Sequence, residues 1–210
     1  MADKVPREHG PVVVGPLEPE PARADNVPDA VAAGPMVYQV VFENDWVRVL
    51  SVTYAAGRAV PLHTHPDRVV YEVATGAARF EKAGMHEVDG SASRAARELM
   101  VELGCQPGAA VPAGDEPVAT YPRLFKLLVG EKRVRVLAVT FGKGTSRPVA
   151  LGDHVLVSRD KGTLVVTPAS GQARALALEP GKVELFPAGV YTATNPTKES
   201  FRVVLFELQP

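Results

Sequence analysis

An internal repeat constrains this 210-residue chain more than any other feature of its sequence. Residues 47–61 align with residues 134–148 at a constant offset of 87, and eight of the fifteen aligned positions are identical. The shared positions include the run Val-Arg-Val-Leu and a glycine turn, at Gly57 and Gly144. The tripeptide Pro-Ala-Gly also occurs twice, at 112–114 and 187–189, in the same order within each half. Two markers in the same order indicate a tandem duplication, so the sequence predicts two copies of one domain.

Short β-branched runs, broken by glycine, proline and aspartate, fill the chain from Val37 onward. They predict strands without long helices between them, which is typical of an antiparallel sandwich or barrel. Residues 91–100 differ, because they are rich in alanine and arginine and begin with a serine suited to a helix cap, so a short helix is predicted there. The predicted strands are 47–54, 68–73, 134–141, 155–158, 163–167 and 201–208.

Residues 1–35 differ in composition from the rest of the chain. They hold seven of the 19 prolines and no aromatic residue. Such a segment cannot bury enough apolar surface to offset the entropy lost on ordering. We predict a flexible Pro/Ala-rich N-terminal arm. The alternative is an ordered strap that packs Val12, Val13 and Val14 against the body.

The charge balance excludes two classes of partner. The formal net charge is −1, whereas a nucleic-acid or membrane-surface binder needs a basic face. No window approaches the roughly 20 apolar residues of a membrane helix, and no targeting segment is visible. The single cysteine, Cys105, fits a reducing compartment. We therefore expect a cytoplasmic protein, monomeric or homodimeric, with no nucleic-acid or membrane partner.

The stretch Gly57-x5-His63-Thr-His65, followed by a strand and Gly76, resembles the first motif of the cupin superfamily. Pro-Ala-Gly near the end of each half resembles the second motif, in which a histidine follows. The resemblance covers about residues 37–210 and is to duplicated small bacterial cupins. It implies an all-β fold of two tandem double-stranded β-helix (jelly-roll) barrels. The predicted ranges are 36–128 for barrel one, which holds the histidine pair, and 129–210 for barrel two.

His63 and His65 lie two residues apart on a strand, so both side chains project from the same face, which in a small barrel is the interior. Two convergent imidazoles suit iron, manganese, nickel, copper or zinc. Interior histidines bonded to backbone or water have the same spacing, however. Together with the resemblance, the pair predicts one divalent transition metal in barrel one.

The third metal ligand is open. Val69 stands where the first motif carries a carboxylate, and it cannot coordinate. Asp67 has the right strand parity and is one candidate, although it also fits a turn acid. Glu116, four residues after Pro112, is a second candidate at the second-motif histidine position, and it also fits a solvated loop charge. His86 is most simply a surface residue, but it is another candidate donor.

In the alignment of the two halves, barrel two has no histidine at the positions of His63 and His65. At offset 87 the histidine pair becomes Ala150 and Gly152, and Tyr191 or Thr192 stands at the second-motif histidine position. Barrel two is therefore predicted to be degenerate and metal-free.

The resemblance implies a metal-dependent enzyme of oxygenase, isomerase or cyclase type, acting on a small organic molecule in barrel one. The metal ligands would be His63 and His65 with Glu116 or Asp67. A divalent ion held there would polarise a bound carbonyl or carboxylate, or activate dioxygen. Glu116 is also a candidate catalytic base, and Tyr71 is a candidate catalytic donor in the pocket. The alternative is a non-catalytic bicupin that binds or senses a small ligand.

Overall fold

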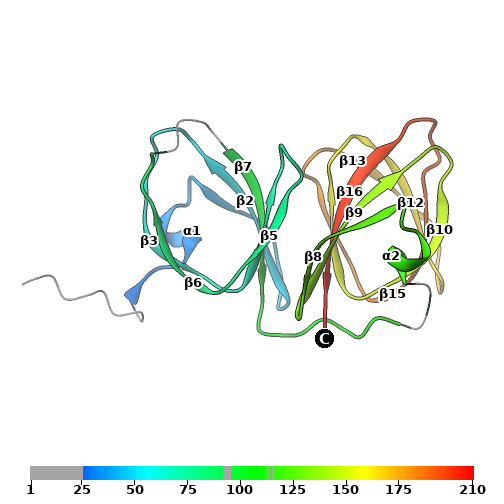
Figure 1. Cartoon of the computed structure of the whole chain (residues 1–210), viewed down its shortest axis with the longest axis horizontal. Helices are drawn as coiled ribbons and strands as arrows, with labels where there is room; N and C mark the ends of the chain where they lie inside the picture. Colours follow the sequence, from blue (N-terminus) through cyan, green and yellow to red (C-terminus); the bar gives the residue numbers. More distant parts are fainter. Residues whose placement is uncertain (1–25, 92–95, 113, 115) are drawn as a thin grey trace, which may run out of the picture.

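The computed structural model describes residues 26–91, 96–112, 114 and 116–210 and shows two β-barrels side by side (Figure 1). This arrangement confirms the predicted all-β fold of two tandem barrels. The first barrel contains β1 (Tyr38–Glu43), β2 (Val47–Tyr54), β3 (Val60–His65), β4 (Arg68–Glu72), β5 (Ala78–Glu81), β6 (Gly84–Val88) and β7 (Ala96–Leu103). The second contains β8 (Phe125–Glu131), β9 (Val134–Phe141), β10 (Ser146–Leu151), β11 (His154–Ser158), β12 (Gly162–Pro168), β13 (Arg174–Leu178), β14 (Val183–Phe186), β15 (Gly189–Thr194) and β16 (Phe201–Leu208).

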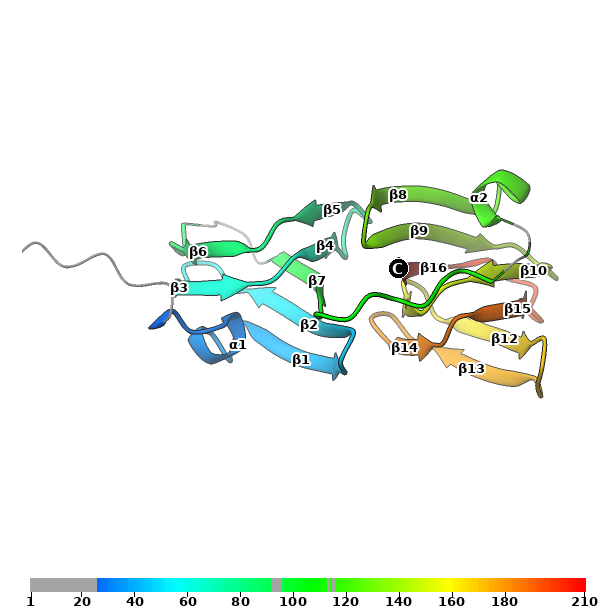
Figure 2. The same cartoon turned by 90° about the horizontal axis from the view of Figure 1, so that it is seen from below.

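Each barrel pairs a five-stranded antiparallel sheet with a smaller sheet. The large sheets have the orders β1-β2-β7-β4-β5 and β14-β11-β16-β9-β8. The small sheets are β3-β6 in barrel one and β10-β15-β12-β13 in barrel two. The β12–β13 hairpin has no counterpart in the described part of barrel one, where a turn at residues 73–77 joins β4 to β5 (Figure 2).

The repeat extends further upstream than the sequence match. The one-turn helices α1 (Ala30–Ala33) and α2 (Pro117–Thr120) lie 87 residues apart, and each is followed by a strand with a bulge. Strand β8 hydrogen-bonds to β9 within the second large sheet, so this sheet begins before residue 129. We therefore propose that barrel two begins near Glu116 rather than at residue 129.

Residues 96–100 form a strand and not the predicted helix, while residues 92–95 lie outside the described part of the chain. Strand β7 pairs with β2 on one side and with β4 on the other. Leu99, Val101 and Leu103 are buried on one face of the sheet, while Met100 and Glu102 are buried on the other. This two-sided burial outweighs the helix propensity of a few alanine and arginine residues.

Residues 26–35 pack on barrel one and do not extend from it as part of an arm; residues 1–25 lie outside the described residues. Ala30 is fully buried in the core of barrel one. Asp29 accepts a hydrogen bond from the backbone N–H of Ala32 and pairs with Arg48 at 2.7 Å. In the described part of the chain, no helix is long and apolar enough to cross a membrane.

The outer faces of the two large sheets pack against each other through a cluster of buried apolar side chains from both barrels, which we call the interbarrel cluster. Tyr71 of β4 and Phe206 of β16 meet edge to face within it, with ring centroids 6.1 Å apart. Separate cores fill the interior of each barrel. The interbarrel cluster consists of Val47, Val49, Val69, Tyr71, Leu99, Val101, Leu103, Val134, Val136, Val155, Val157, Val204, Phe206 and Leu208.

We expect Phe206→Ala to lower the free energy of unfolding by about 3–5 kcal/mol, because it leaves a cavity between the two barrels. The single tryptophan, Trp46, packs against this cluster from barrel one, so its fluorescence during urea unfolding reports the loss. Leu127→Ala, at an exposed position of β8, is the control and should change stability by about 0.5 kcal/mol or less. An unchanged Trp46 transition in Phe206→Ala would mean that the barrels unfold independently.

Candidate metal centre

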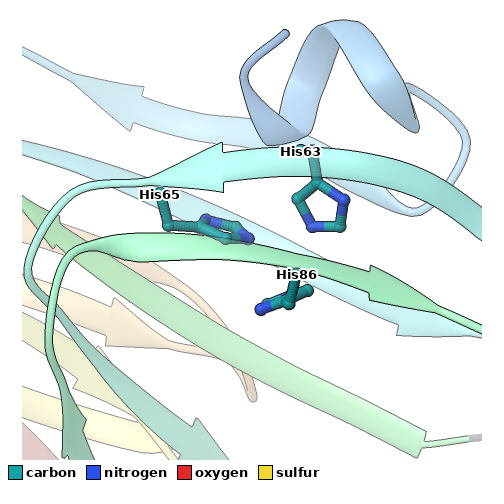
Figure 3. A group of neighbouring side chains, drawn as sticks. All are labelled: His63, His65 and His86. Atoms are coloured by element: carbon teal, nitrogen blue, oxygen red, sulfur yellow. The ribbon is translucent and has the colours of Figure 1, made fainter. Parts of the chain in front are cut away.

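Three histidines from two paired strands meet inside barrel one (Figure 3). His63 and His65 project from β3, and His86 projects from β6 directly opposite His63 in the register. The ring centroid of His63 lies 4.9 Å from that of His65 and 4.5 Å from that of His86. One nitrogen from each ring lies within 4.8 Å of the others. The third side chain beside His63 and His65 is thus an imidazole, and not the carboxylate expected from the sequence.

His86 occupies the second-motif position that the sequence analysis assigned to Pro112 and Glu116. In both barrels an aspartate fixes the start of the strand concerned: Asp67 accepts from the backbone N–H of Ala83 at 2.7 Å, and Asp153 accepts from that of Ala188 at 2.8 Å. The run Ala-Gly-Met-His at 83–86 therefore corresponds to Ala-Gly-Val-Tyr at 188–191. Lysine replaces the motif's proline at position 82, and this substitution hid the match.

Hydrogen bonds orient two of the three rings. The Nδ1 atom of His63 lies 2.7 Å from the carbonyl oxygen of Pro61, which only accepts, so Nδ1 carries the hydrogen. The Nδ1 atom of His65 lies 2.7 Å from the Glu102 carboxylate and donates to it in the same way. In the neutral form of each ring, Nε2 is then the nitrogen that carries the lone pair. The Nε2 atom of His65 is buried and has no hydrogen-bond partner.

Burial keeps His63 and His86 in the form that binds metals. It lowers the pKa of His63, and it lowers the pKa of His86 to about 4, with a further contribution from the neighbouring imidazoles and Arg68. A lowered pKa means that the rings are neutral at pH 7. Neutral imidazole is the protonation state that coordinates a metal ion.

The carboxylate of Glu102, behind His65, connects the histidine cluster to Arg48 and Asp29 through hydrogen bonds. Glu102, fully buried on β7, accepts from His65 at one oxygen and from Arg48 Nε at the other, the latter at 2.6 Å. Arg48 in turn pairs with Asp29 ahead of α1. Such a carboxylate–histidine bond holds a ligand ring in one tautomer and one orientation.

Barrel two has an equivalent set of arginine–carboxylate pairs but lacks the three histidines. Arg135 Nε pairs with the buried carboxylate of Glu207 at 2.6 Å, and the Arg135 guanidinium pairs with Glu116 at 2.5 Å. The second oxygen of Glu207 accepts from the backbone N–H of Gly152 instead of a side chain. The Arg–Glu pair is thus common to both barrels, and only barrel one connects it to an imidazole.

The other residues predicted for the site lie elsewhere. Glu116 caps α2 through the N–H of Ala119 and pairs with Arg135, so it belongs to barrel two. Asp67 holds the turn before β6 and lies 3.4 Å from Lys82. Tyr71 faces the interbarrel cluster, because its strand parity places it on the outer face of the large sheet. The structure brings none of these three to the histidines, and His86 takes their place.

The residues present fit a metal ion. Three imidazoles converge, and the buried, unpartnered Nε2 of His65 costs free energy unless a ligand satisfies it. Imidazole donors suit zinc, copper, iron and nickel. Neither Val69 nor Val70 supplies the carboxylate that the first motif would add, and both are fully buried among apolar side chains.

In barrel two, apolar side chains stand in the histidine positions. Val149 of β10 pairs with Tyr191 of β15 as His63 pairs with His86, so the offset in this strand is 86 and not the 87 of the sequence alignment. A bulge between Val60 and His63 accounts for the shift. Val149 and Tyr191, with Leu151 and His154, line an apolar cavity of about 30 Å³.

Comparisons with solved structures give the same fold at low sequence identity. AerE from Microcystis aeruginosa matches with 11% identity over 83% of this chain and 98% of its own, at a TM-score of 0.54. Salicylate 1,2-dioxygenase from Pseudaminobacter salicylatoxidans matches with 11% identity over 78% and 71%, at 0.52. A cupin domain protein from Bordetella pertussis Tohama I matches with 22% identity over 41% and 93%, at 0.38. No protein-family model and no curated protein matches the sequence.

The two buried glutamates provide a matched test of the carboxylate behind His65. We expect Glu102→Gln to weaken transition-metal binding by roughly 10–100-fold, the range for loss of a residue that orients a ligand. Glu207→Gln removes the same charge beside an equivalent arginine, but it should leave metal affinity unchanged. Competition with a chromophoric chelator measures both. Equal affinities in the two variants would show that Glu102 does not act through His65.

Proposed function

We propose that this chain, which has the cupin fold in two tandem copies, is a metal-dependent enzyme with a single metal centre in barrel one. One observation carries the proposal: His63, His65 and His86 converge inside the barrel, and the Nε2 atom of His65 is buried without a partner. These three residues would hold a divalent transition ion. The ion would supply Lewis-acid polarisation of a bound oxygen atom, or a site at which dioxygen reacts.

The charges around the histidines favour an anionic substrate. Three neutral imidazoles leave the charge of a divalent ion uncompensated, and the nearest buried carboxylate, Glu102, is already paired with Arg48. Arg68, which is 4% exposed and lies beside Glu102 on the same face of the sheet, pairs with Glu81 through Nη2, while its buried Nε–H has no partner and could donate to a bound acid. A carboxylate or phenolate would be stabilised here by charge. We therefore propose a small organic acid as the substrate class.

The proposed residues of this chain have separate tasks. The three histidines bind the ion, and Glu102 keeps His65 in the tautomer that does so. Arg68 would donate its unpartnered Nε–H to an acidic substrate. Leu50 and Met100, both buried in the interior core, exclude water from one side of the metal centre. A dry surrounding strengthens the electrostatic interactions between these groups and the substrate.

Metal content tests the ligand assignment. We expect purified protein to hold about one transition-metal ion per chain, because the histidines occur in one barrel only. His86→Ala should lower the metal affinity at least about tenfold. Glu116→Gln and Asp67→Asn should leave it unchanged, because both side chains are engaged away from the histidines. Elemental analysis after gel filtration measures all four proteins, and equal metal in His86→Ala and wild type would contradict the assignment.

Turnover distinguishes an enzyme from a ligand-binding protein. Because salicylate 1,2-dioxygenase shares this fold, oxygen consumption by the iron-loaded protein is the first assay, with small aromatic and aliphatic hydroxy acids as substrates. Mass spectrometry of the same mixtures detects isomerisation or cyclisation without oxygen uptake. Binding of an acid by calorimetry without any product would favour the non-catalytic alternative.

A further inference from the structure

We propose that Tyr38 is a fourth protein ligand at this metal centre. Tyr38 begins β1 and is fully buried in the core of barrel one. Its ring centroid lies 5.2 Å from that of His63 and 5.4 Å from that of His65. The proposal rests on the metal centre of the proposed function and adds an oxygen donor that the two sequence motifs do not contain.

The distance between donor atoms supports this role. The Tyr38 hydroxyl oxygen lies 3.1 Å from His63 Nε2. Two atoms bound to one ion at about 2.0–2.1 Å, and separated by angles between a right angle and the tetrahedral angle, lie about 2.8–3.4 Å apart. The hydroxyl therefore already stands at the separation of two neighbouring ligands.

The direction of the hydrogen bonds shows what metal binding would do to Tyr38. Because His63 Nδ1 carries the hydrogen donated to Pro61, Nε2 can only accept, and the Tyr38 hydroxyl donates to it. Tyr54 lies 3.1 Å from the same hydroxyl and donates to Tyr38. An ion at Nε2 removes the acceptor of a fully buried hydroxyl, which is costly if nothing replaces it. Coordination by the oxygen, with loss of one proton to solvent, satisfies the group, and metal binding at such sites releases protons.

The other candidate oxygen ligands are engaged elsewhere. Both oxygens of Glu102 accept hydrogen bonds, from His65 and from Arg48. Asp67 holds the N–H of Ala83. The first-motif carboxylate is replaced by valine. Among the described residues, the Tyr38 hydroxyl is the oxygen that hydrogen-bonds to a metal-facing imidazole nitrogen.

The repeat itself provides a comparison for this residue. Tyr38 corresponds to Phe125 at offset 87, and each is buried as the first residue of its strand. The barrel with histidines thus has tyrosine here, and the barrel with valine and leucine in the histidine positions has phenylalanine. Tyr38→Phe is therefore a substitution that the same backbone position already accepts in barrel two.

The experiment uses the full chain loaded with Fe(II) under argon and then oxidised to Fe(III). Coordination by a tyrosine oxygen gives a visible phenolate-to-Fe(III) charge-transfer band. We expect this band in wild type and in Tyr54→Phe, which removes the donor to Tyr38 but leaves its oxygen. Tyr38→Phe should lose the band and bind Co(II) roughly tenfold or more weakly, since loss of a ligand should cost at least as much as loss of an orienting group.

The outcomes separate this inference from the proposed function. If wild type and Tyr38→Phe bind iron and Co(II) equally and neither shows the band, the inference fails and the three-histidine centre stands. If wild type binds neither ion, both proposals fail. Circular dichroism of Tyr38→Phe confirms that the variant is folded, and loss of the band in Tyr54→Phe alone would also overturn the assignment.

Discussion

Strands β2, β4 and β7 bury apolar side chains on both faces, one toward the neighbouring barrel and one toward their own interior. Removing barrel two would expose Val69, Tyr71 and Val101 of barrel one to water, and apolar exposure costs roughly 25 cal/mol per Å². Barrel two therefore packs against the outer face of β4 and β7, the strands that carry Arg68 and Glu102 on their inner face. Barrel two lacks the three histidines, but it still packs against the strands that lie behind them in barrel one.

The two interiors differ through a few substitutions on a shared frame. The pairs Arg48–Glu102 and Arg135–Glu207 have the same geometry, and Asp67 and Asp153 brace the same turn. Against this constant frame the histidine positions become valine, leucine and tyrosine, and Tyr38 becomes Phe125. Buried charges need partners wherever they occur, so the Arg–Glu pair is retained in both barrels. The interior positions carry no such constraint and have diverged.

Local patterns account for what the sequence predicted well. The repeat at 47–61, the spacing of His63 and His65 on a strand, and the resemblance to cupins together predicted the two barrels and two of the three histidines. Tertiary effects account for the misses. Residues 96–100 became a strand because both faces are buried, a bulge shifted the repeat by one residue before His63, and Lys82 concealed the motif that contains His86. A search for Ala-Gly-x-His at the turn would have found it.

The described part of barrel one lacks a counterpart of the β12–β13 hairpin, and the two barrel interiors therefore differ in their exposure to solvent. In barrel two, Leu164 and Val166 of β12 line the apolar cavity and extend the small sheet to four strands. In barrel one, the turn at 73–77 stands in its place, and His86 keeps part of its surface exposed. The shorter connection therefore leaves fewer strands over the interior of barrel one, and His86 is partly exposed where the corresponding Tyr191 of barrel two is buried.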